Sequence, residues 1–142
     1  MRVSAKIDYA CRALMDLSLR WPDPSPVPVQ EIARRQKIPI KFLVHILISL
    51  KQLGFVESVR GKRGGYRLMK PPQEIKLSDV IKNFGGLGYA IGFDGNKKEP
   101  HQVMDSIWQE IDRTLWHMME GINLETIANR QRSQGDAVIY EI

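Results

Sequence analysis

Proline and glycine residues divide the first 85 positions into short segments, which leaves room only for short helices and a hairpin. Four prolines occupy alternate positions between residues 22 and 28 and require an extended connector, because proline interrupts a helix and restricts the residue before it. Pro39 suits the start of a helix, and Gly54 suits its end. We therefore expect helices over residues 5–20, 30–36 and 40–53, and strands over residues 55–60 and 66–69.

Two helices joined by a tight turn and followed by a hairpin are the arrangement of a winged helix-turn-helix domain. We expect residues 1–84 to form this domain, with a short fourth helix at its end. Five of the eleven glycines lie between residues 85 and 95, so residues 85–99 are expected to be a loop. The remaining segment, residues 100–142, is expected to hold a long helix over residues 100–120, a short helix over residues 124–130 and a strand-like tail over residues 137–140. The predicted fold class is mainly α, with a small β-hairpin wing and a long dimerisation helix.

The charge of the chain is distributed unevenly. Its 142 residues carry a formal charge of +5, but residues 1–83 hold 16 Lys and Arg against 7 Asp and Glu, whereas residues 84–142 hold 5 against 9. A basic front suggests a polyanion as its partner, although a solvated basic surface is the simpler alternative. The longest apolar run, residues 42–50, is too short to span a membrane. The single cysteine, Cys11, excludes a disulfide within the chain and fits the cytoplasm, where we expect the protein to act.

The sequence offers little for catalysis. Its three histidines, His45, His101 and His117, fall in different predicted elements, and none has an acid at a spacing typical of a catalytic triad. No phosphate-binding loop or nucleophile elbow is present in the sequence. We therefore expect no enzyme activity, no cofactor and no metal.

DNA binding has the better physical case. The helix over residues 40–53 should turn one face away from its core, and on that face it carries Lys41, Val44, His45, Ile48 and Gln52. The polar residues of this face can form hydrogen bonds with base edges or phosphates, and the two β-branched residues can pack on thymine methyl groups. The alternative is that a neighbouring element covers this face. The turn of the wing supplies Arg60, Lys62 and Arg63 beside Gly64, and Arg2 can reach flanking phosphates.

The long helix carries an apolar seam. Its members are spaced 4, 3, 4, 3 and are Met104, Trp108, Ile111, Leu115 and Met118. This heptad spacing favours pairing with a second copy of the same helix. Packing of the seam on its own domain is the alternative.

Several stretches resemble the Rrf-two family of bacterial winged-helix transcription regulators, of the IscR, NsrR and CymR type. They are residues 6–10, 31–33, 42–43, 50–56 and the wing motif Arg-Gly-x-x-Gly-Gly-Tyr at residues 60–66. The resemblance implies a homodimer on a palindromic operator, with Tyr9 at a phosphate, the helix over residues 40–53 in the major groove and Arg60 in the minor groove. Cluster-binding relatives place three cysteines in the loop that corresponds to residues 85–100, where this chain has none. The resemblance therefore implies a member without an iron–sulfur cluster.

The expected function is a cytoplasmic, dimeric, sequence-specific regulator of transcription, acting as a repressor on double-stranded DNA. A winged-helix module that binds RNA, or one that binds a protein, is the alternative. The signal, a small-molecule effector or a regulatory protein, is left open.

Overall fold

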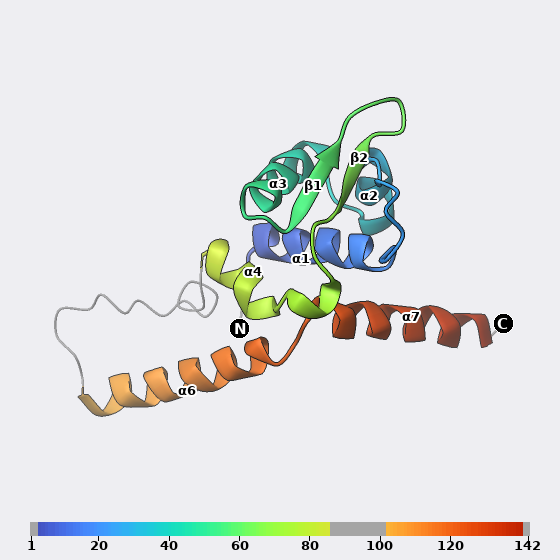
Figure 1. The fold of residues 1–142 in the computed structure, drawn as a ribbon. Coiled ribbons are helices and arrows are strands. Elements are labelled where there is room, and N and C mark those ends of the chain that lie inside the picture. The colour runs from blue at the N-terminus through green and yellow to red at the C-terminus, as the bar shows by residue number, and fades with distance from the viewer. Residues whose placement is uncertain (1–2, 86–101, 141–142) are drawn as a thin grey trace.

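The computed structural model describes residues 3–85 and 102–140 (Figure 1). Its elements are α1 (Ala5–Ser18), α2 (Val29–Gln36), α3 (Ile40–Gln52), β1 (Val56–Val59), β2 (Gly65–Leu68), the 3-10 turn η1 (Pro72–Glu74), α4 (Leu77–Asn83), α6 (Gln102–Glu120) and α7 (Leu124–Tyr140). The predicted class, a mainly helical winged helix-turn-helix with a two-stranded hairpin, is confirmed. Arg2, His101 and the predicted loop beyond Gly85 lie outside the described residues.

Local signals explain where the first helices begin and end. Ser4 caps α1, because its hydroxyl accepts a hydrogen bond from the Ile7 amide at 3.3 Å. Pro39 precedes α3, and Gly54, at φ +81°, follows its last turn. Lys37 ends α2 in a left-handed conformation (φ +53°) that produces the tight turn into α3.

The core lies where α1, α2 and α3 meet. Its most buried large side chains include Leu14 from α1, Ile32 from α2 and Leu47 from α3. The apolar spacing along α3 places Phe42 and Leu53 on its core-facing stripe, but they are 58% and 39% exposed. Both lie at one edge of the apolar stripe of α3, whereas Leu43, Leu47 and Leu50 nearer its centre are fully buried.

The wing is an antiparallel hairpin in which Val56 pairs with Leu68 and Val59 pairs with Gly65. The proline-rich connector adds a bridge to it, since Val27 and Tyr66 exchange backbone hydrogen bonds of 2.8 and 2.9 Å. A Cβ atom at position 65 would overlap the carbonyl oxygen of Val27, so glycine is required for this close approach. The connector therefore fixes the base of the wing.

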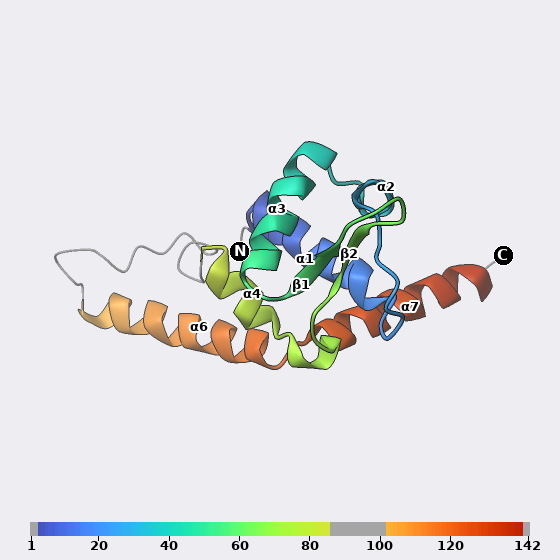
Figure 2. The same ribbon diagram turned by 45° about the horizontal axis from the view of Figure 1, so that its top comes forward.

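The last two helices lie on the opposite side of the molecule from the wing (Figures 1 and 2). The turn between them is bound to the segment before α4, because the Leu77 amide donates to Ile122 O at 2.8 Å and the Leu124 amide donates to Ile75 O at 2.9 Å. Met119 and Leu124 join the same core as α1 to α3. The C-terminal helices are thus attached to the winged-helix domain by both packing and backbone bonds.

The predicted strand-like tail over residues 137–140 is wrong, because α7 continues as a helix through Tyr140. An isolated extended segment leaves its backbone groups without ladder partners, whereas a continued helix satisfies them within the segment. Asn123 starts α7 by accepting a hydrogen bond from the Thr126 amide at 2.9 Å.

Candidate nucleic-acid interface

The outer face of α3 is open to solvent. All five residues predicted to turn away from the core are exposed, namely Lys41, Val44, His45, Ile48 and Gln52. Val44 and Ile48 are 40% and 43% exposed, although each is β-branched and apolar. No described element covers this face, so the alternative that a neighbouring segment shields it has no support among residues 3–85 and 102–140.

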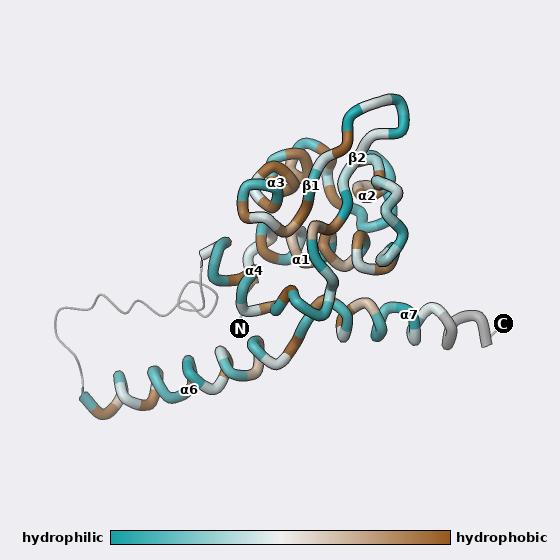
Figure 3. The backbone as a smooth tube through the Cα atoms, viewed as in Figure 1, coloured by the Kyte–Doolittle hydropathy of each residue, from teal (hydrophilic) through white to brown (hydrophobic). Residues whose placement is uncertain are grey.

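The wing turn carries the second group of candidate residues. Arg60, Lys62 and Arg63 are exposed there, and Figure 3 shows hydrophilic residues at the turn. Gly61 has φ +127°, which favours glycine. A Cβ atom at position 64 would overlap the carbonyl oxygen of Val59, so Gly64 is needed to close the hairpin itself, a role that the sequence did not suggest.

Other basic residues of the hairpin have structural contacts. Arg67 donates to the Glu57 carboxylate (2.6 Å) and to Pro24 O (2.9 Å), so it ties β2 to β1 and to the connector. The Lys70 ammonium lies 5.1 Å from the centre of the Phe55 ring. Among the described contacts, Arg60, Lys62 and Arg63 of the turn have no ion pair or side-chain hydrogen bond, in contrast to Arg67.

The outer face of α3 and the wing turn lie on the same side of the molecule. In both ribbon views they lie away from α6 and α7 (Figures 1 and 2). A helix and a basic turn on the same side of a domain can meet adjacent grooves of one duplex. We call α3's outer face and the wing turn together the reading surface.

The start of α1 borders the reading surface. Tyr9 is half-buried, and the Arg12 guanidinium lies 5.4 Å from the centre of its ring. Arg12 also forms an ion pair with Asp8 and donates a hydrogen bond to Gln36 O at 3.1 Å. Its guanidinium is therefore already bound to groups of the protein itself. Lys6 is exposed and lines a hollow together with residues of α3.

A buried ion pair holds α2 against α1. Asp16 is 2% exposed, and it accepts hydrogen bonds from Arg35 at 2.8 and 3.0 Å and from Gln36 at 3.0 Å. The bond to Asp16 is the main cause that raises the pKa of Arg35. A bidentate contact of this kind fixes orientation as well as distance. It sets the position of α2 and, through the tight turn, of α3.

Two faces of α6 differ in what they contact. One face, which includes Met119 and the half-buried Trp116, packs on the winged-helix domain. The other face exposes large apolar side chains, which are Val103, Met104, Ile107, Trp108, Ile111 and Met118. Of the predicted seam, Leu115 alone is half-buried against its own domain. Figure 3 shows the hydrophobic residues recurring along α6. We call the exposed set the outer face of α6.

The residues present do not suit an iron–sulfur cluster. The chain has one cysteine, and clusters are held by several thiolates. Burial raises the pKa of the Cys11 thiol from 9.0 to about 12, with the nearby Asp8 charge as a smaller cause. Within residues 3–85 and 102–140, no three His, Cys, Asp or Glu side chains are grouped as metal ligands would be.

Cys11 is expected to react slowly with iodoacetamide at pH 8. A rise of the pKa from 9.0 to about 12 lowers the thiolate fraction, and hence the rate, by about 1,000-fold. Because the folded pKa lies above the unfolded one, thiolate formation favours the unfolded chain as pH rises from 9 towards 12. Mass spectrometry of native and urea-unfolded protein measures the two rates. Equal rates would show that the thiol is accessible and ionises normally.

The sequence profile of the Rrf2 family, described as iron-dependent transcriptional regulators, matches residues 3–130. The fold is that of a winged helix-turn-helix protein, and the chain belongs to the Rrf2 family. The family consists of transcriptional regulators and not of enzymes. Among the described residues, no helix is long and apolar enough to cross a membrane.

Similar proteins agree with this assignment. IscR from Photorhabdus laumondii is 31% identical over 134 residues, which cover 92% of this chain and 81% of that protein. The structure of T. potens IscR has a TM-score of 0.77 at 28% identity, covering 92% of this chain and 88% of that one. CymR, the global cysteine regulator of B. subtilis, has a TM-score of 0.80 and covers 92% of this chain and 98% of its own, but at 22% identity this likeness shows the fold alone.

Two further relatives match over a shorter region. HTH-type regulators from Rhodobacter capsulatus and Synechocystis are 37% and 42% identical over 86 and 81 residues, which cover 59% and 57% of this chain. The chain therefore spans only 57% and 54% of the length of these relatives.

Proposed function

We propose that this chain is a sequence-specific regulator that binds a palindromic operator as a homodimer in the cytoplasm, without an iron–sulfur cluster. The observation that carries the proposal is the reading surface, where an uncovered helix face lies beside three exposed cations. A dimer that covers promoter DNA excludes polymerase, so we propose repression as its effect.

The two parts of the reading surface have different tasks in this proposal. Lys41, His45 and Gln52 bond base edges or phosphates in the major groove, and Val44 and Ile48 pack on thymine methyl groups. The wing cations contact phosphates, with Arg60 entering a narrow minor groove. Tyr9 and Arg2 contact flanking phosphates.

The outer face of α6 supports the proposed dimer. Its exposed large apolar side chains, Trp108 and Ile111 among them, form a contiguous stripe along one helix. Such a stripe is unfavourable in water, and self-pairing across a two-fold axis would cover it. Two-fold symmetry in the protein would be matched by a palindrome in the operator.

Variants of the two parts are expected to fail in different ways. Lys62→Ala and Arg63→Ala should weaken binding to all duplexes alike and reduce the salt slope by about 0.9 per lost phosphate contact. Val44→Ala and His45→Ala should instead change the preferred operator, by about 1–3 kcal/mol at one base pair of each half-site. The measurement is fluorescence anisotropy with an operator selected from random DNA, its single-base variants and a scrambled duplex, at several salt concentrations.

Lys76→Ala is the matched control, since this exposed lysine lies next to the turn between α6 and α7, away from the reading surface. Equal loss of operator and scrambled DNA binding by the α3 variants would refute the major-groove assignment. A preference for a structured RNA competitor would favour the RNA-binding alternative. Binding of a protein partner that persists at high salt would favour the protein-binding alternative.

A further inference from the structure

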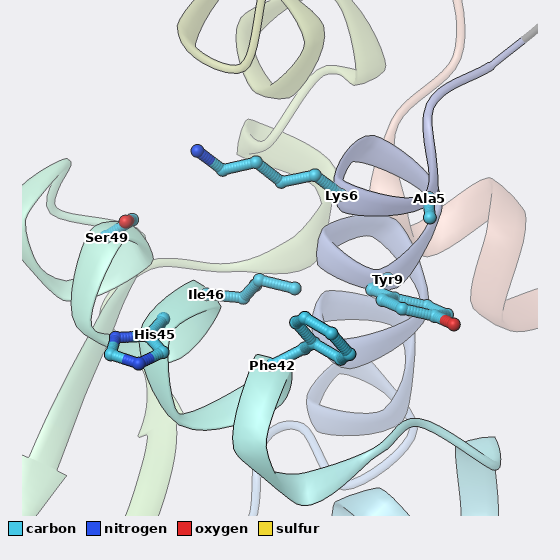
Figure 4. Close-up of a pocket in the computed structure, with 7 residues that line it drawn as sticks. All are labelled: Ala5, Lys6, Tyr9, Phe42, His45, Ile46 and Ser49. Carbon is cyan, nitrogen blue, oxygen red and sulfur yellow. The ribbon is translucent and has the colours of Figure 1, made fainter.

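A hollow of about 370 Å³ lies between α1 and α3, at the border of the reading surface. Its lining residues are Ala5, Lys6 and Tyr9 from α1, and Phe42, His45, Ile46 and Ser49 from α3 (Figure 4). The volume is in the range of sites that hold small organic molecules. Tyr9 and His45 are also proposed DNA contacts, but the proposed function gives no role to Lys6, Phe42 or Ser49 of the lining.

Aromatic side chains form two walls of the hollow. In Figure 4 the Phe42 ring extends from α3 towards α1, where the Tyr9 ring lies along the helix with its hydroxyl pointing away from Phe42, and Ile46 lies beside them. Phe42 leaves 58% of its surface in water, although it is a large apolar side chain. A flat aromatic ring placed here would cover both rings and gain from stacking or edge-to-face contact. The walls therefore favour an aromatic ligand.

The polar groups of the hollow favour an anion. Lys6 is the one formally charged side chain among its described lining residues, and none of these residues is acidic. The Lys6 ammonium lies 5.3 Å from the centre of the Phe84 ring, and this cation–π contact favours its present position. In Figure 4 the ammonium lies at the upper edge of the hollow. The Ser49 hydroxyl and the His45 imidazole supply hydrogen-bonding groups from α3. A carboxylate complements this set.

We propose that the hollow binds a small aromatic carboxylate, and that the bound molecule competes with the duplex. The competition rests on the proposed function, because Tyr9 and His45 line the hollow and are also proposed DNA contacts. Each ligand would then lower the affinity for the other by the same factor. A phosphate of the duplex is a second anion that could meet Lys6, so the site must be tested first without DNA.

The first test titrates 2-naphthoate and its uncharged analogue 2-naphthamide into the full chain by calorimetry, in the absence of DNA. We expect one saturable site per chain for the carboxylate and at least about tenfold weaker binding of the amide, because only the former forms a charge-assisted bond. Lys6→Gln should remove that difference, and Phe42→Ala should weaken both ligands. Lys82→Gln, the same change at an exposed lysine of α4 outside the lining, should alter neither.

Absence of saturable binding, or equal binding of the two ligands, would overturn the site. So would an unchanged affinity in Lys6→Gln and Phe42→Ala, whose folding is checked by thermal denaturation. The second test adds 2-naphthoate to the operator complex and expects a lower operator affinity for the unmodified chain and for Lys82→Gln. Naphthoate binding without this loss overturns the competition. If no operator is bound at all, the proposed function fails while the first test still decides the site.

Discussion

A double variant, Trp108→Glu with Ile111→Glu, is expected to sediment as a monomer at concentrations where the unmodified chain is a dimer. In the proposed dimer the two substitutions place four carboxylates across one apolar seam, which like-charge repulsion and lost burial both disfavour. Trp108 and Ile111 are 44% and 42% exposed in the single chain, so the protomer should keep its fold. Operator affinity should fall by about 100-fold or more, because each monomer then holds one half-site without its tethered partner.

Ser106→Glu with Gln109→Glu provides the matched control. It adds the same charge to exposed positions of α6 that lie away from the outer face. This variant should remain a dimer in analytical ultracentrifugation. A Trp108→Glu, Ile111→Glu protein that is still dimeric would place the interface elsewhere on the molecule.

Arg35→Ala is expected to lower the free energy of unfolding by about 3–5 kcal/mol, because it leaves a buried carboxylate without its ion partner. The carboxylate is that of Asp16, which is 2% exposed and keeps only the Gln36 amide as a side-chain donor in the variant. The displacement of α2 should also weaken operator binding, since α2 sets the position of α3. Urea denaturation measures the first effect, and anisotropy with the operator measures the second.

Arg20→Ala is the control for Arg35→Ala, because it removes an arginine from an exposed ion pair and not from a buried one. Arg20 and Glu31 form an exposed pair at 3.7 Å, and breaking it should cost less than about 1 kcal/mol. The double variant Asp16→Leu, Arg35→Met should be more stable than Arg35→Ala, since it leaves no unpaired charge in the core. If Arg35→Ala proves as mild as Arg20→Ala, water reaches the Asp16 carboxylate and the pair does not position α2.

The winged helix-turn-helix could be predicted from the sequence because its boundaries are encoded locally. Pro39, Gly54 and Gly61 each act within one or two residues of their own position. The exposed face of α3 could also be predicted, because the 3.6-residue period of a helix shows which residues share a face, whatever element packs against it. These signals need no contact between distant parts of the chain.

Features that depend on distant contacts were missed or misassigned. Phe42 is a large apolar side chain, but 58% of it is exposed, because which part of an apolar stripe is buried depends on how neighbouring elements pack on it. The structural role of Arg67 was missed, because its partners Glu57 and Pro24 lie 10 and 43 residues away in the sequence. The tail of α7, residues 137–140, is rich in β-branched and aromatic residues, as strands are, but the sheet of the described residues consists of β1 and β2 alone. Asp16 gave no signal at all, because its partner is 19 residues away on another helix.

The turn between α6 and α7 has a mechanical consequence for the proposed dimer. Backbone bonds to Ile75 and Leu77, and the burial of Met119 and Leu124, fasten α6 to the domain that carries α3. In the proposed dimer, α6 and α3 of one protomer would then keep a fixed relative position. The angle between the two paired α6 helices would therefore determine the distance between the two α3 helices. The dimer would therefore fit operators with one fixed distance between the two half-sites. It would accept one spacing of half-sites and reject operators in which a base pair is added between them, because the added pair both lengthens and rotates the second half-site.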